Sequence, residues 1–184
     1  MLKKPKNPWK KLSSKYVYKN AFIKVREDKV IDPQGKKALY GVIERTPIVY
    51  IIAVNDDGKI CLVGQYRYTT GVYSWEIPAG GCDGEPPLVA AKRELWEEAG
   101  FKAKQWKKLG VFQTAMGIAN IECHVYLAKQ LTQTGKNKMH EEGISGIKMV
   151  SLTQIAKDFI SGKNIDGPTA TALFYYLSYS DKKK

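Results

Sequence analysis

The sequence has little cysteine and no long apolar run. Its three cysteines, Cys61, Cys82 and Cys123, are odd in number and far apart. This spacing excludes a disulfide framework and a zinc site, and it predicts a reducing compartment. No apolar stretch reaches the roughly 18 residues that a membrane-spanning helix needs, and the basic N-terminus lacks the apolar segment of a secretory signal. We therefore expect a cytoplasmic protein that makes no contact with membranes.

The balance of charge is strongly basic. Thirty Lys and Arg residues against 18 Asp and Glu residues give a net charge of +12, which is common in nucleic-acid-binding proteins. Much of the excess lies at the ends, at Lys3, Lys4, Lys6 and residues 182–184. The sequence also lacks a zinc finger, an aromatic ribonucleoprotein motif and a basic helix. Nucleic acid is therefore not the expected partner, whereas a basic protein attracts anionic nucleotides.

The length of 184 residues suits one domain, with or without an arm. Residues 1–14 are predicted to form a flexible leader, since Pro5 and Pro8 block a helix. Alternating apolar residues on both sides of residues 32–36 predict a β-hairpin. We interpret residues 1–46 as a leader and β arm, and residues 47–184 as the main domain.

The main domain alternates between strand and helix patterns. Strands are expected at residues 48–54, 59–66, 109–115, 121–131 and 147–150, a polar loop at 135–146, and helices at 152–160 and 168–179.

The most informative stretch is residues 78–101, which predicts a glycine-rich loop followed by a helix. Pro86 and Pro87 favour the first turn of a helix, and Gly100 is typical of the left-handed residue just after one. A buried stripe is expected from the spacing of Leu88, Ala91, Leu95 and Ala99.

Three acids, Glu94, Glu97 and Glu98, crowd the C-terminal end of this helix, where the helix dipole is already negative. Glu94 and Glu98 are also four residues apart and repel each other. One interpretation is a solvated acidic face on which Arg93 pairs with Glu97. The other is a cation site, because carboxylate oxygens bind Mg²⁺ or Mn²⁺ and such an ion would remove the repulsion.

The run from Arg93 to Phe101, RELWEEAGF, resembles the core of the Nudix box, G-x5-E-x7-R-E-U-x-E-E-x-G-U, in which U is a bulky aliphatic residue. Seven residues separate Glu85 from Arg93, as the pattern requires. Two positions depart from it. The loop is one residue short, so that strict counting puts Ala79 at the glycine position, and Phe101 replaces an aliphatic residue.

The resemblance covers about residues 18–179. Over this stretch the order of elements resembles the ADP-ribose pyrophosphatase branch of the Nudix family, whose marks include Gln65-Tyr66-Arg67 and an acidic loop after the box. It implies an α/β fold, namely an α/β/α sandwich around a mixed sheet with an N-terminal antiparallel β arm, and a homodimer formed through that arm. It also implies Mg²⁺-dependent hydrolysis of nucleoside diphosphate sugars, ADP-ribose included, to a nucleoside monophosphate and a sugar phosphate.

The same resemblance implies roles for the acidic residues. The metal ligands would be Glu94, Glu97, Glu98 and the carbonyl group of Ala79, with Arg93 holding Glu97 in place. The general base would come from the loop after the box, from Glu141 or Glu142. We prefer Glu141 because of its distance from the strand expected at 147–150.

Substrate contacts are implied at Arg67 and Glu76, at Tyr18 of the arm, and at Met116 and Gly117. Met116 stands where ADP-ribose enzymes usually have a proline, which favours a broader range of sugar nucleotides over ADP-ribose alone.

Two alternatives remain. The first is a Nudix hydrolase of nucleoside triphosphates or of capped RNA. The second is a non-catalytic Nudix-fold module that binds nucleotides. Such modules commonly lose the acids of the box, whereas Glu94, Glu97 and Glu98 are all present.

Overall fold

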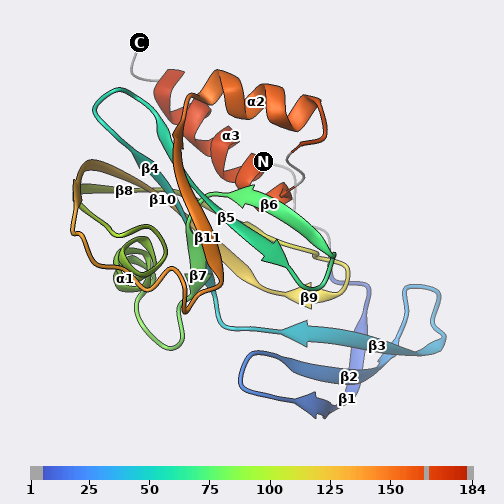
Figure 1. Cartoon of the computed structure of the whole chain (residues 1–184). Coiled ribbons are helices and arrows are strands. Elements are labelled where there is room, and N and C mark those ends of the chain that lie inside the picture. Colours follow the sequence, from blue (N-terminus) through green and yellow to red (C-terminus); the bar gives the residue numbers. More distant parts are fainter. Residues whose placement is uncertain (1–5, 164–165, 182–184) are drawn as a thin grey trace. The chain divides into compact units, whose positions relative to one another are not determined.

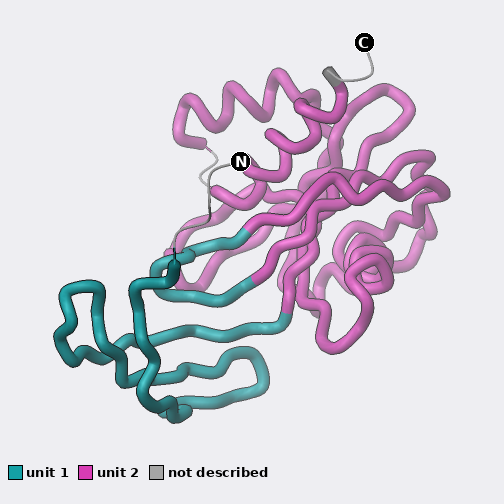
Figure 2. The backbone as a smooth tube through the Cα atoms, turned by 180° about the vertical axis from the view of Figure 1, so that it is seen from behind, with its two compact units in different colours: residues 1–46, 113–121 teal, residues 47–112, 122–184 magenta. Residues whose placement is uncertain are grey.

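A computed structural model describes residues 6–163 and 166–181. The chain forms two compact units (Figure 2). Unit 1 comprises residues 1–46 and 113–121, and unit 2 comprises residues 47–112 and 122–184. Residues 113–121, assigned from the sequence to the main domain, group with the arm because the Ile43 amide donates to the Ile118 carbonyl at 2.8 Å and a short strand pairs with the arm there.

Unit 1 is a four-stranded sheet in the order β1-β2-β3-β9. Its strands are β1 (Lys10–Lys19), β2 (Lys24–Ile31), β3 (Lys37–Glu44) and β9 (Ala119–Asn120). The pairs β1–β2 and β2–β3 are antiparallel, and β3–β9 is parallel. The predicted hairpin around residues 32–36 joins β2 to β3, with Gly35 in the left-handed region at φ 83°.

The predicted flexible leader is wrong from Lys10 onward, where β1 begins. Residues 1–5 of that leader lie outside the described residues. All ten side chains of β1 are exposed. A strand without a buried face has no apolar alternation to reveal it, and only its hydrogen bonds with β2 define it.

Unit 2 contains a seven-stranded sheet and three helices (Figure 1). Its strands are β4 (Ile48–Val54), β5 (Ile60–Arg67), β6 (Val72–Glu76), β7 (Ala79–Gly81), β8 (Phe101–Gln113), β10 (Glu122–Gln133) and β11 (Ile144–Val150). Its helices are α1 (Pro87–Ala99), α2 (Leu152–Ile160) and α3 (Gly167–Asp181). The main path runs β11-β5-β4-β10-β8, with β6 paired to β5 and β7 to β4. The β4–β10 pair is parallel and the β5–β11 pair antiparallel, so the sheet is mixed, as predicted.

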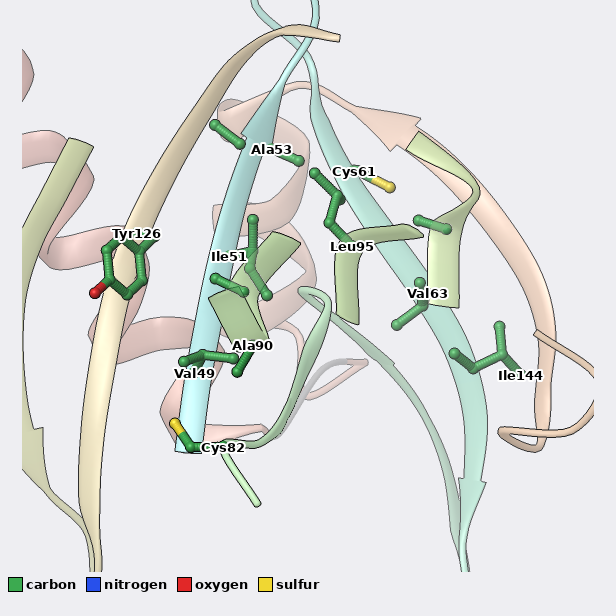
Figure 3. Close-up of a cluster of buried hydrophobic side chains, with 13 residues drawn as sticks. Val49, Ile51, Ala53, Cys61, Val63, Cys82, Ala90, Leu95, Tyr126 and Ile144 are labelled. Atoms are coloured by element: carbon green, nitrogen blue, oxygen red, sulfur yellow. The ribbon is translucent and has the colours of Figure 1, made fainter. Parts of the chain in front are cut away.

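The central strands β4 and β5 are buried on both faces, which is why they read as nearly continuous apolar runs. Val49, Ile51 and Ala53 of β4 face α1, as Figure 3 shows, together with Ala90 and Leu95 of the helix. The alternate side chains of β4 and β5 pack with α2 and α3. Two clusters on opposite faces of one sheet make the predicted α/β/α sandwich.

Helix α1 begins and ends as predicted. Pro87 opens it, and Gly100 closes it at φ 67°, donating its amide to the Trp96 carbonyl at 2.9 Å. Ala91, Leu95 and Ala99 are buried, but Leu88 is 37% exposed, so the predicted stripe is wrong there. Helical side chains point back toward the N-terminus, and that of Leu88 therefore extends past the first turn. Within the described residues, no helix is long and apolar enough to cross a membrane.

Candidate active site

The three acids of α1 are buried, not solvated. Glu94, Glu97 and Glu98 are only 6%, 8% and 6% exposed, so the interpretation as a solvated acidic face is wrong. They lie on the helix that packs its apolar side against β4 and β5. A buried carboxylate is stable only if it is paired, hydrogen-bonded or protonated, and the partners of these three acids therefore define the site.

Arg93 is the main partner. Its Nε donates to Glu85 at 2.8 Å, and its Nη1 to Glu94 at 2.7 Å and to Glu97 at 2.8 Å. Its Nη2 donates to the Gly81 carbonyl at 2.8 Å. Burial lowers the pKa of Arg93, but the bonds with Glu85 and Glu97 outweigh this effect and raise it above its usual value. The expected Arg93–Glu97 pair is therefore present, and the same guanidinium also ties the glycine loop to the helix.

The partners of Glu98 and Glu94 only partly offset the cost of burying their charged forms. Burial raises the pKa of Glu98 to about 8, against the stabilising hydrogen bond that its Oε2 accepts from the Ala79 amide at 2.8 Å. Burial likewise raises the pKa of Glu94, while Arg93 opposes this shift. Desolvation disfavours the charged form of an acid, and a cation bound here would favour that form again and lower both pKa values.

The glycine loop brings backbone against this charge. A Cβ atom on Gly80 would overlap the carboxylate group of Glu94. Only a residue without a side chain therefore lets the loop lie on the acid.

We expect Gly80→Ala to displace the Glu94 carboxylate and to lower both cation affinity and turnover, roughly 10- to 100-fold. Calorimetric titration with Mn²⁺ and steady-state kinetics measure the two effects. Gly41→Ala is the control, since a Cβ there meets nothing within 4 Å and its φ is not positive. Equal, small effects of both substitutions would contradict the role given to Gly80.

The donor set fits a hard divalent cation by its chemistry, because it consists of carboxylate and carbonyl oxygens. Within residues 6–163 and 166–181, however, no three His, Cys, Asp or Glu side chains are arranged around a common ion position. Glu94 and Glu97 are turned toward Arg93, and Glu98 accepts from the Ala79 amide. The three predicted carboxylate ligands are thus gathered in one place but occupied with internal partners.

The loop after β10 is tied to the end of α1. The Thr134 hydroxyl donates to the Gly100 carbonyl at 2.9 Å, and the Lys138 amide to the Glu97 carbonyl at 2.8 Å. Lys138 Nζ also lies 3.3 Å from Glu97 Oε1. These contacts hold the loop that carries Glu141 and Glu142 against the end of α1.

The two acids of this loop differ in their influence on the site. The charge of Glu142 raises the pKa of both Glu94 and Glu98. Glu141 is not among the larger causes of these two pKa shifts. The amide of Glu142 donates to the Lys138 carbonyl at 3.0 Å, which links it to the residue that contacts Glu97.

Arg67 and Glu76, both predicted to contact substrate, form an ion pair. The end of β5 places Arg67 beside Glu76 of β6, and Arg67 Nε lies 3.0 Å from Glu76 Oε1. A second bond joins Arg67 Nη2 to the other oxygen of Glu76. The bond with Glu76 raises the pKa of Arg67 against the effect of burial, and the charge of Glu98 acts in the same direction. Arg67 therefore belongs to the same electrostatic cluster as the box acids, with 45% of its side chain exposed.

Asp166 is a member of this cluster that the sequence reasoning missed. Burial raises its pKa, and the charges of Glu76 and Arg67 act on it in opposite directions. It accepts a hydrogen bond from the Thr169 amide at 2.8 Å, and the Thr169 hydroxyl accepts one from the Ile77 amide at 3.2 Å. An Asp just before the Gly-Pro that opens a helix was the available signal.

The remaining predicted substrate residues belong to unit 1. Tyr18 is 53% exposed and Met116 78% exposed, and the Gly117 carbonyl accepts a hydrogen bond from the Tyr40 hydroxyl at 2.8 Å. The roles of Tyr18, Met116 and Gly117 in substrate binding stay predictions.

Comparison with known proteins identifies the class of this site. The NUDIX domain family matches residues 44–168, and the nucleoside diphosphate sugar hydrolase N-terminal domain matches residues 9–43. Because the first match covers more than half of the chain, the protein belongs to the Nudix family, and the resemblance noted in its sequence is confirmed. Hydrolases of this family generally use divalent metal ions.

Individual relatives narrow the comparison. An ADP-ribose pyrophosphatase of Mycobacterium tuberculosis is 40% identical over 133 residues, which are 71% of this chain and 64% of that protein, just under two thirds of its length. An ADP-ribose pyrophosphatase of Bacillus subtilis is 32% identical over 168 residues, 90% of this chain and 91% of that protein. The crystal structure of an ADP compounds hydrolase superposes with a TM-score of 0.79 over 98% of both chains, at 21% identity, and supports the fold alone.

Proposed function

We propose that this Nudix hydrolase cleaves the pyrophosphate bond of nucleoside diphosphate sugars, including ADP-ribose, to give a nucleoside monophosphate and a sugar phosphate. The observation that carries the proposal is the burial of three carboxylates on one helix end, with the pKa of Glu98 raised to about 8. Buried acids with raised pKa values are typical of catalytic sites. The matched N-terminal domain of sugar nucleotide hydrolases and the two ADP-ribose pyrophosphatases support the choice of substrate.

The cofactor that we propose is Mg²⁺, with Mn²⁺ as a substitute. Glu94, Glu97, Glu98 and the Ala79 carbonyl would hold it. When bound, such an ion screens the negative oxygens of the diphosphate and lowers the pKa of a coordinated water. Arg93 holds Glu85, Glu94 and Glu97 in fixed positions without the ion, because it donates hydrogen bonds to all three.

The general base that we propose is Glu142, and this replaces the preference for Glu141. Glu142 is the loop carboxylate whose charge acts on Glu94 and Glu98. A base must lie within reach of the proton that it accepts. Glu142 takes the proton of the attacking water, and the bonds of Lys138 to the end of α1 hold the loop that carries it.

Arg67 and Glu76 bind the substrate in this proposal. Arg67 presents a half-exposed guanidinium, and its planar fork suits phosphate oxygens. Glu76 fixes the orientation of that fork through two hydrogen bonds. For Tyr18, Met116 and Gly117 of unit 1, contact with the substrate stays a proposal from the sequence resemblance alone.

Hydrolysis of a panel of nucleotides with Mg²⁺ tests the function. ADP-ribose, ADP-hexoses and GDP-hexoses are each expected to yield a nucleoside monophosphate and a sugar phosphate, identified by chromatography and mass spectrometry. Release of pyrophosphate from nucleoside triphosphates, or removal of the 5′ cap from RNA, without cleavage of any sugar nucleotide would favour the alternative Nudix activities instead. Binding without hydrolysis would favour the non-catalytic module.

We further propose a homodimer formed through the β arm. Strand β1 ends the sheet of unit 1, and its exposed side chains include Leu12, Tyr16, Val17 and Tyr18. An edge strand with exposed apolar side chains is a template for pairing with another chain.

Light scattering should therefore give a mass close to twice the 20.7 kDa of the chain. Val17→Lys should shift the protein toward the monomer, because it places a charge on the exposed edge. Ile160→Lys in α2 is the matched control, since this side chain is 88% exposed in unit 2. A monomeric wild type at micromolar concentration would refute the dimer.

A further inference from the structure

A cavity in unit 2 is lined by none of the candidate active-site residues. It has a volume of about 470 Å³ and is formed by β8, β10 and the end of α3. Ligand sites for small molecules are commonly about 300 to 1,000 Å³ in volume. The cavity is therefore large enough to hold a mononucleotide.

The cavity is lined by uncompensated positive charge. Lys104 and Lys107 of β8 and Lys129 of β10 line it, and among the described residues no acidic side chain does. In the part of the chain that the structure describes, the ion pairs use other lysines. Three ammonium groups around one hollow repel one another, and a phosphate group removes this repulsion because lysine binds phosphate as a point charge.

Two aromatic rings line the same cavity, Trp106 and Tyr179. The indole N–H of Trp106 donates to the Ala103 carbonyl at 3.1 Å, so the ring is held by its own strand. Trp106 also packs against the core cluster on the α1 face of the sheet, and Tyr179 against the cluster on the opposite face. An aromatic ring that is fixed in this way offers a surface for the face of a nucleobase, and contacts of this kind contribute roughly 1–3 kcal/mol per base.

We propose that this cavity is a second, non-catalytic site for a nucleoside phosphate, with the phosphates on Lys104, Lys107 and Lys129 and the base against Trp106. The pairing of several cations with aromatic rings in one hollow is the combination that recognises nucleotides, whereas lysines alone would recognise any anion. The inference does not depend on the proposed hydrolysis, because the two sites have no residue in common.

The indole N–H of Trp106 provides a local probe. In ¹H–¹⁵N spectra the chain has four indole signals, one for each tryptophan, and Trp106→Phe identifies the relevant one. ATP is titrated in the presence of EDTA, which prevents metal-dependent hydrolysis. We expect a saturable shift of the Trp106 signal that persists in Glu98→Gln, the active-site variant.

Charge reversal then tests the lysines. Lys104→Glu combined with Lys129→Glu should weaken ATP binding at least about 10-fold, or about 1.4 kcal/mol, with circular dichroism confirming the fold. Lys102→Glu is the matched control, because Lys102 lies on β8 but outside the cavity.

Three results would overturn the proposal: no shift of the Trp106 signal at millimolar ATP, an unchanged affinity in the double variant, or loss of the shift in Glu98→Gln. Inorganic triphosphate is the final comparison. Weaker binding of inorganic triphosphate than of ATP supports a contact with the base, and equal affinity is a fourth result that would overturn the proposal.

Discussion

Glu98→Gln is expected to lower the turnover of ADP-ribose by roughly 10²- to 10³-fold, on the scale of losing one preorganised electrostatic contact in an active site. Glu98 is a buried carboxylate whose Oε2 accepts a hydrogen bond from the Ala79 amide. A glutamine has the same shape and keeps an oxygen for that amide, but it loses the negative charge that would hold a cation. The fold should therefore survive while the chemistry fails.

Steady-state kinetics and calorimetric titration with Mn²⁺ measure this loss. Glu27→Gln is a matched control, because it makes the same change of charge at a partly exposed ion pair with Lys15 in unit 1. Turnover of Glu98→Gln within a factor of a few of the wild type would remove Glu98 from the proposed metal site.

Glu98→Gln should also change how the stability of the metal-free protein depends on pH. Burial raises the pKa of Glu98 from its usual value near 4.5 to about 8. Between these two values the folded chain binds a proton that the unfolded chain has released. The free energy of unfolding therefore falls as pH rises, by up to roughly 1.4 kcal/mol per pH unit for this group. The loss of stability caused by Glu98 is absent below the pKa of the unfolded chain and complete above the pKa of the folded chain.

In EDTA, the melting temperature of the wild type should consequently fall more steeply between about pH 5 and about pH 9 than that of Glu98→Gln. Added Mn²⁺ should restore the wild type at high pH and leave the variant nearly unchanged. Parallel melting curves for the two proteins over this range would mean that Glu98 is not a destabilising buried acid.

Much of the fold could be predicted from the sequence where apolar periodicity or turn chemistry was strong. β4, α1, α2 and α3 lie within a few residues of their predicted positions. The exposed strand β1 and the first half of β8 were missed for a common reason. In its first half β8 alternates Phe101 and Ala103, which pack on the core, with Lys102 and Lys104, which are exposed. A charged outer face hides such a strand.

Arg93, Glu94, Glu97 and Glu98 could be named from the sequence because they lie within six residues of one predicted helix. Their burial could not, since it depends on how the helix lies on the sheet. Contacts between distant segments were also out of reach. The hydrogen bond from Ile77 to Thr169 joins two residues that are 92 positions apart in the sequence. Asp166 is separated from the Arg67–Glu76 pair by a similar stretch of sequence.

Glu142→Gln and Glu141→Gln should differ sharply in activity, and this comparison identifies the base. Loss of a general base costs roughly 10²- to 10⁴-fold in rate, so we expect a loss in this range for Glu142→Gln. Glu141→Gln should stay within a few-fold of the wild type. The two residues are neighbours in one exposed loop, which makes each the matched control for the other.

The pH profile separates a base from a residue that merely holds the loop. If Glu142 accepts the proton, the acidic limb of the kcat profile should disappear in Glu142→Gln, and hydroxide at high pH should partly restore the rate. A residue that only orders the loop would raise KM or lower kcat at every pH and leave the limb in place. Equal, small effects of both substitutions would place the base outside this loop. In that case the influence of Glu142 on Glu94 and Glu98 would be electrostatic alone, and the buried acids of α1 would have to activate the water without it.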